Sequence, residues 1–141
     1  MARGVRTKPI PLPHLNVAAQ PLEGLEYLIE KTTKAAVVGG GGILVNVPLP
    51  ARYALHKLWV AKSRPVSEQT KARKDRAQAR QVVEVLLADR AGDIEEAVIA
   101  MRRRPKMWKR AQKDLDQLTE GQAANPMIDI LVAHKGFHPK G

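Results

Sequence analysis

The residues with the clearest capacity for chemistry lie between positions 71 and 76, where one acid stands among basic residues. Asp75 is preceded by Lys71, Arg73 and Lys74 and is followed by Arg76. Apolar residues surround it at the three- and four-residue steps of a helix, namely Ala72, Ala79, Val82, Val83 and Leu86. This period predicts a long helix that carries Asp75 on or beside its inward stripe.

The spacing of Asp75 allows two interpretations. Lys71 stands one helical turn earlier, where side chains four residues apart meet, so the two could form an ordinary intrahelical ion pair. Exposed pairs of this kind are common and contribute only about 0.2–0.5 kcal/mol. A carboxylate near the buried side of a helix could instead orient a lysine toward a phosphate group. Spacing alone favours the ion pair.

The segment before this helix reads as a strand, a tight turn and a second helix. The apolar run 43–47 is stopped by Pro48 and Pro50, and Pro50 suits a first helical turn, where its missing N–H has no intrahelical partner anyway. The packed face of the expected helix consists of Ala51, Ala54, Leu55, Leu58 and Ala61. Arg52, His56 and Lys57 lie beside that face. His56 could act as an acid or base near neutral pH, but a spectator role is the more ordinary one.

Two stretches of this region resemble a known family. Residues 45–58 read Val-Asn-Val-Pro-Leu-Pro-Ala-Arg-Tyr-Ala-Leu-His-Lys-Leu, and residues 71–79 read Lys-Ala-Arg-Lys-Asp-Arg-Ala-Gln-Ala. They resemble the carboxy-terminal part of a bacterial family with the nucleotidyltransferase fold and, more distantly, the abortive-infection type nucleotidyltransferase toxins. The similarity covers about residues 8–115.

The resemblance implies a set of nucleotide-binding residues. In the resembled proteins, one helix bears a lysine and the next carries a basic-Lys-Asp signature that helps to hold the nucleotide. The matching positions are Lys57 for the first lysine and Lys74 with Asp75 for the signature. Together with Lys71, one turn before Asp75, they form the expected contact set for a nucleoside triphosphate.

The chain also departs from the family pattern. Ala72 and Gln78 stand where the toxin-type signature has an arginine and a second aspartate. That superfamily also uses a Gly-Ser or Gly-Gly turn followed by paired carboxylates, which hold Mg²⁺ against the triphosphate. No such strand occurs in this sequence, and Asp114 and Asp116 are two apart in a helical stretch and point to different faces. No metal ligands are therefore assigned.

We expect, on these grounds, a nucleotidyltransferase-fold protein that lacks the amino-terminal catalytic half. Mg²⁺ would act only if that half were supplied, for example by a separate catalytic polypeptide. Catalytic residues in this chain are unknown, and its status as an enzyme stays open.

The fold class expected from the patterns is α+β, with a small β-sheet, the remnant of a nucleotidyltransferase fold, followed by a C-terminal helical bundle. Residues 1–50 form a small α/β portion, residues 51–120 a helical subdomain and residues 121–141 a C-terminal tail. The bundle comprises the helix from Pro50 and three more: one capped by Ser67 that runs to about Arg90, one after residue 93, and one with Trp108, Ala111, Leu115 and Leu118 facing inward.

The first portion contains a glycine-rich hairpin. Two β-prone runs, 34–38 and 43–47, flank four glycines at 39–42. A phosphate-binding loop would end in Gly-Lys-Ser/Thr and lead into a helix, whereas these glycines lead into a strand. Prolines at 9, 11 and 13 suit an edge strand. A helix is expected from about 20 to 31, with Leu22, Leu25, Leu28 and Ile29 on its inward face.

The charge of the chain suggests an anionic partner and a second hypothesis. Its 24 basic and 14 acidic residues give a formal net charge of +10, which favours a nucleotide or nucleic acid and, less strongly, an acidic membrane surface. The densest cationic segment comprises Arg102, Arg103, Arg104, Lys106, Lys109, Arg110 and Lys113. The alternative function is therefore a non-enzymatic module that binds RNA or DNA phosphates through this segment and the cations at 71–80. The same side chains could also be merely solvated.

Other features suggest a cytoplasmic protein. The sequence has no cysteine, and therefore no disulfide framework and no thiolate metal site. Its apolar runs are far shorter than the ~20 residues of a membrane span, and its start shows no signal-peptide pattern.

Residues 127–133 could add a late strand. His134 and His138 have a metal-binding spacing only on a helix, which Gly136 and Pro139 disfavour.

Overall fold

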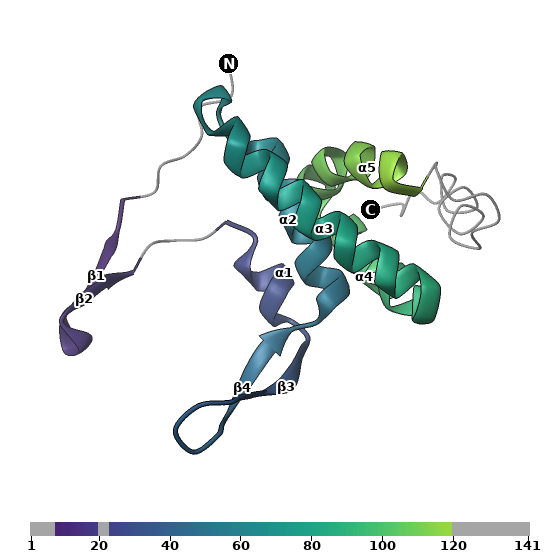
Figure 1. The fold of residues 1–141 in the computed structure, drawn as a ribbon. Helices are drawn as coiled ribbons and strands as arrows, with labels where there is room; N and C mark the ends of the chain where they lie inside the picture. Colours follow the sequence, from purple (N-terminus) through teal and green to yellow (C-terminus); the bar gives the residue numbers. More distant parts are fainter. Residues whose placement is uncertain (1–7, 20–22, 120–141) are drawn as a thin grey trace.

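The computed structural model describes residues 8–19 and 23–119. These residues form an α+β fold, as the patterns predict. Its elements are β1 (Ile10–Leu12), β2 (Val17–Ala19), α1 (Leu25–Ile29), β3 (Thr32–Val37), β4 (Ile43–Pro48), α2 (Pro50–Ser63), α3 (Gln69–Asp89), α4 (Ala91–Arg102) and α5 (Pro105–Thr119), with short 3₁₀ turns at Pro13–Leu15 and Val66–Glu68 (Figure 1).

Helix α2 is the centre of the molecule, because α1, α3, α4 and α5 all pack against it. Figure 1 shows α2 and α3 side by side, with α4 and α5 completing the helical part. Pro50 occupies the first turn of α2, as expected. The predicted apolar stripe of α2 is buried in full, and it meets Val83 and Leu86 of α3, Ile94 and Met101 of α4, and Leu115 of α5.

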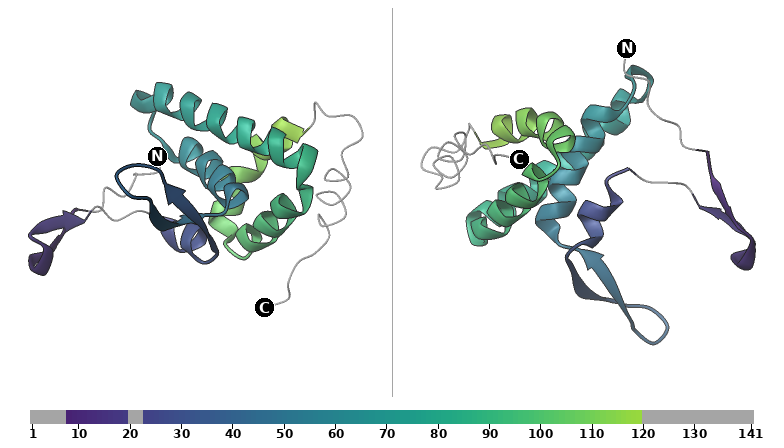
Figure 2. Two further views of the ribbon diagram at one scale, coloured as in Figure 1. Left: turned by 60° about the horizontal axis from the view of Figure 1, so that its bottom comes forward. Right: turned by 180° about the vertical axis from the view of Figure 1, so that it is seen from behind.

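The β portion is divided between two antiparallel hairpins, β1–β2 and β3–β4. The glycine-rich hairpin is confirmed, with Val37 opposite Ile43 and Thr32 opposite Pro48. The proline-rich edge strand is also confirmed as β1, but its partner β2 was not expected. Figure 2 shows both hairpins projecting away from the helices.

Helix α1 differs from its prediction in length and in its buried face. In the described residues it spans only Leu25–Ile29, and Gly24 precedes it with a left-handed φ of 76°. Leu25 and Ile29 are 39% and 58% exposed, whereas Tyr27 is fully buried. The Tyr27 hydroxyl donates to the Ala97 carbonyl oxygen at 2.9 Å, so a tyrosine rather than the expected apolar stripe anchors this helix.

Arg52 of α2 also holds α1 in place, through hydrogen bonds. It was expected beside the packed face of α2, but it is buried. Its Nη1 donates to the backbone oxygen of Tyr27 at 2.8 Å and to the Glu30 carboxylate at 2.6 Å. Arg104, after α4, lies 3.6 Å from the same carboxylate. Charged contacts thus tie α1 to α2 and to the α4–α5 turn.

The ends of α3 also differ from the sequence interpretation. Its N-cap is Glu68 rather than Ser67, with no capping hydrogen bond from the side chain, because Val66–Glu68 forms a 3₁₀ turn. At the other end only Arg90 separates α3 from α4, which starts at Ala91. The inward stripe of α3 is otherwise confirmed, and Asp75 is buried within it.

Candidate functional site

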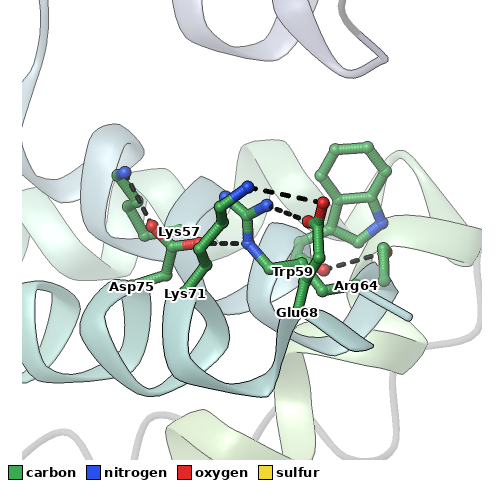
Figure 3. Close-up of polar contacts among 7 residues, drawn as sticks. Lys57, Trp59, Arg64, Glu68, Lys71 and Asp75 are labelled. Atoms are coloured by element: carbon green, nitrogen blue, oxygen red, sulfur yellow. Dashed lines mark hydrogen bonds and ion pairs between the residues drawn. The ribbon is translucent and has the colours of Figure 1, made fainter. Parts of the chain in front are cut away.

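Asp75 is the centre of an ion-pair network between α2 and α3. Its side chain is only 5% exposed. One carboxylate oxygen accepts a hydrogen bond from Lys57 Nζ at 2.8 Å, and the other accepts one from Arg64 Nε at 2.7 Å (Figure 3). Both donors come from outside α3. The interpretation of Asp75 as half of an intrahelical pair with Lys71 is therefore wrong.

Arg64 extends the network to Glu68, the N-cap of α3, and through Glu68 to Lys71 in the first turn of α3. Arg64 Nη1 donates to Glu68 at 2.8 Å, and Lys71 Nζ lies 3.4 Å from the other oxygen of Glu68. We call Lys57, Arg64, Glu68, Lys71 and Asp75 the Asp75 network; Figure 3 shows its contacts as a continuous row. The network holds three cations and two carboxylates.

The local sequence explains how Arg64 reaches Asp75. Pro65 disfavours helical backbone at the residue before it, and Arg64 is extended, with ψ at 141°. Helix α2 therefore ends at Ser63, and the chain turns through Val66–Glu68 into α3. This turn brings the guanidinium back along the first turns of α3.

The network keeps its central groups charged at neutral pH. Burial by itself raises the pKa of Asp75, but the hydrogen bonds from Lys57 and Arg64 outweigh burial, so the pKa of Asp75 is lowered. The hydrogen bond to Asp75 raises the pKa of Lys57. Lys57 is therefore a fixed ammonium group, suited to binding an anion and not to acting as a neutral nucleophile or base.

Only some of the nucleotide-binding residues predicted from the sequence belong to this network. Lys57, Lys71 and Asp75 belong to it, and Lys71 is the most exposed of the three, at 66%. Lys74 is exposed on α3 and lies outside the network. Arg64 was missed. It directly follows the end of α2 in an extended conformation, so helical periodicity gives no signal for it.

The basic segment 102–113 is not uniformly open to solvent. The Arg102 guanidinium lies over the Trp108 ring at 4.9 Å. Arg104 donates to the Ala100 carbonyl oxygen at 3.0 Å, and Arg110 donates to Ser63 Oγ at 3.0 Å. The exposed members are Arg103, Lys106, Lys109, Arg110 and Lys113.

The described residues do not fit a divalent metal ion. Within 8–19 and 23–119, no group of three His, Cys, Asp or Glu side chains could hold one. Among the described residues, the two buried aspartates are both engaged by cations, Asp75 as above and Asp114 by Arg76 at 2.8 Å. The strand considered at 127–133 and the pair His134 and His138 lie outside the described residues.

His56 is half-buried beside the Trp59 ring, with Nε2 3.4 Å from the Glu23 carbonyl oxygen. Burial lowers the pKa of His56, so the imidazole is neutral at physiological pH.

In the part of the chain that the structure describes, no helix combines the length and the apolar character that crossing a membrane requires.

Comparison with protein-family models matches residues 2–103 to a family described as nucleotidyltransferase. The matched range contains both hairpins, α1 to α4 and every residue of the Asp75 network. Comparisons with curated proteins and with solved structures gave no match.

Proposed function

The chain belongs to the nucleotidyltransferase family, and from that premise we propose that it is a nucleotide-binding part of a nucleotidyltransferase. Lys57 and Lys71 contact the phosphates of a nucleoside triphosphate, Lys74 adds positive charge at the edge of the site, and Asp75 orients Lys57. Arg64 joins this set. The observation that carries the proposal is that one buried carboxylate holds Lys57 and Arg64 together from two positions on the chain.

The donor inventory of the network supports phosphate binding. An ammonium has three N–H donors and a guanidinium has five. Asp75 takes one donor of Lys57, while Asp75 and Glu68 take donors of Arg64. The remaining donors can bind phosphate oxygens, and charge-assisted hydrogen bonds of this kind are the strong ones. Because Asp75 already orders both side chains, less conformational entropy is lost when the phosphate binds.

We propose that this chain binds the nucleotide and does not by itself carry out a complete catalytic cycle. The carboxylates that would hold Mg²⁺ are not among the described residues. We propose that a separate catalytic polypeptide or region supplies them, and that Mg²⁺ takes part only there.

The test is calorimetric titration of the chain with ATP, CTP, GTP and UTP in the presence of Mg²⁺. Lys57→Met removes the ammonium held by Asp75, and we expect it to weaken binding by about 10- to 100-fold, since hydrogen bonds to charged groups contribute about 1.5–3 kcal/mol. Lys74→Ala is expected to have a smaller effect because this lysine is exposed.

Lys62→Met is the matched control, because Lys62 is an exposed lysine in the last turn of the same helix. We expect its nucleotide affinity to stay within about twofold of wild type, as an exposed charge contributes little. Absence of nucleotide binding by the wild-type chain, or an equal loss in the Lys57 and Lys62 variants, would rule out the proposed site.

A second candidate function is nucleic-acid binding by the exposed members of the basic segment, Arg103, Lys106, Lys109, Arg110 and Lys113. Their exposure on α5 and just before it favours this function. In filter binding to duplex oligonucleotides of unrelated sequence, the logarithm of affinity is expected to fall linearly with the logarithm of salt concentration. The double variant Lys106→Ala/Lys109→Ala should reduce the magnitude of that slope by about 1.8, since each phosphate contact contributes about 0.9.

The control for this experiment is Lys34→Ala/Lys62→Ala, which removes two exposed lysines from other elements. Its slope should match that of the wild-type chain. A flat salt response in the wild-type chain excludes the nucleic-acid function and leaves the nucleotide site as the role of the basic charge.

A further inference from the structure

Tyr53 lies on the same face of α2 as Lys57, one of the cations of the Asp75 network. Lys57 follows it by one helical turn, which at a rise of 1.5 Å per residue is about 6 Å along the helix. Arg64 follows the end of α2 at Ser63 in an extended conformation, and Asp75 holds it beside Lys57. The site thus presents an aromatic ring and an ammonium on one face of α2, with a guanidinium next to the ammonium.

The Tyr53 ring is in contact with the network itself. Lys57 Nζ lies 5.4 Å from the ring centroid, within the range of a cation–π contact. The same ammonium is bound to Asp75 at 2.8 Å. Tyr53 is half-buried, whereas Tyr27 and Trp59 belong to the core. Of these three aromatic residues, Tyr53 is therefore the one that can meet a ligand held by Lys57.

We propose that Tyr53 is the nucleobase-stacking residue of this site. The bound nucleotide lies along α2, with its base against Tyr53, its first phosphate near Lys57 and its terminal phosphates near Arg64 and Lys71. This inference rests on the proposed function. Because every base has a π-face, stacking on an aromatic ring tolerates all four bases, and the site discriminates nucleotides from inorganic polyphosphate more strongly than it discriminates one base from another.

The test compares ATP with inorganic tripolyphosphate by calorimetric titration, under the same salt conditions. The wild-type chain is expected to bind ATP about 5- to 150-fold more tightly than tripolyphosphate, the range that stacking of one base gives. Tyr53→Leu should remove this difference by weakening ATP binding while leaving tripolyphosphate binding within about twofold. Tyr53→Phe keeps the ring and should keep the preference for ATP.

A second measurement needs no variant. In the wild-type chain with ATP, nuclear Overhauser effects are expected between the adenine protons and the ring protons of Tyr53. Circular dichroism of each variant checks that it is folded, and if Tyr53→Leu fails to fold, the Overhauser measurement decides the question.

The outcomes separate the two proposals. Equal affinities of the wild-type chain for ATP and tripolyphosphate, an equal loss of both in Tyr53→Leu, or absence of the ring-to-base Overhauser effect would each overturn the role of Tyr53. The phosphate site would stand if tripolyphosphate binding still depended on Lys57. Binding of neither ligand would overturn the proposed function, and the stacking role with it.

Discussion

Asp75→Ala is expected to lower the free energy of unfolding by about 3 kcal/mol. Removing one partner of a buried ion pair costs about 3–5 kcal/mol, because the remaining charge is left without compensation. Here the remaining charges are Lys57 and Arg64, whose side chains are 24% and 25% exposed, so the lower end of that range applies. Urea unfolding followed by circular dichroism measures the change.

Asp89→Ala is the control, because Asp89 is an exposed aspartate at the end of the same helix. Its effect should stay within about 0.5 kcal/mol, as for other surface substitutions. Equal and small losses in both variants would show that the Asp75 network contributes no more than an exposed pair.

The effect of Asp75→Ala is also expected to depend on pH in a defined way. The pKa of Asp75 is lowered in the folded chain, so its stabilisation is present above the unfolded value of about 3.9 and is lost as pH falls through the folded value. The pKa of Lys57 is raised, so its contribution is present below about 10.4 and is lost as pH rises through the folded value.

The difference in free energy of unfolding between wild type and Asp75→Ala should therefore be constant between about pH 5 and pH 9 and shrink on both sides. Urea unfolding at a series of pH values tests this dependence. A difference that grows as pH falls below 4 would mean that Asp75 is not held by cations in the folded chain.

Gly24→Ala is expected to destabilise the chain by about 2–6 kcal/mol. Gly24 has a φ of +76°, and an added Cβ would lie 3.0 Å from Trp59 and 3.1 Å from Met107. A non-glycine residue in this backbone region costs on the order of 1–3 kcal/mol, and overpacking a core typically adds about 1–3 kcal/mol. Thermal unfolding monitored by circular dichroism would record a lower Tm.

Gly42→Ala separates the two contributions. Gly42 also has a positive φ, of +67°, but an added Cβ there meets nothing within 4 Å. This variant carries the backbone cost without the clash, so its loss of stability should be clearly smaller than that of Gly24→Ala. Similar effects at both positions would mean that the contact of Gly24 with the core is unimportant.

The sequence by itself determined the elements whose residues interact with near neighbours. The stripe on α2 and the stripe from Ala72 to Leu86 on α3 follow from helical periodicity, which places residues three and four apart on one face. The hairpin around the glycines at 39–42 follows from local turn chemistry. Periodicity also placed Asp75 at the buried side of α3, which the structure confirms.

Only the tertiary structure decided which charges meet. Arg64 is 11 residues from Asp75, and Tyr27 is 70 residues from Ala97, and no repeat in the sequence indicates either contact. Arg52 likewise is expected only beside the packed face of α2, and its contacts with Glu30 and the Tyr27 backbone are seen only in the structure. Periodicity reports which face of a helix is apolar, but the partner of a buried charge depends on how helices and turns pack in space. Because of that packing, Asp75 of the basic helix α3 forms ion pairs with Lys57 of α2 and with Arg64, and so joins α2 to α3.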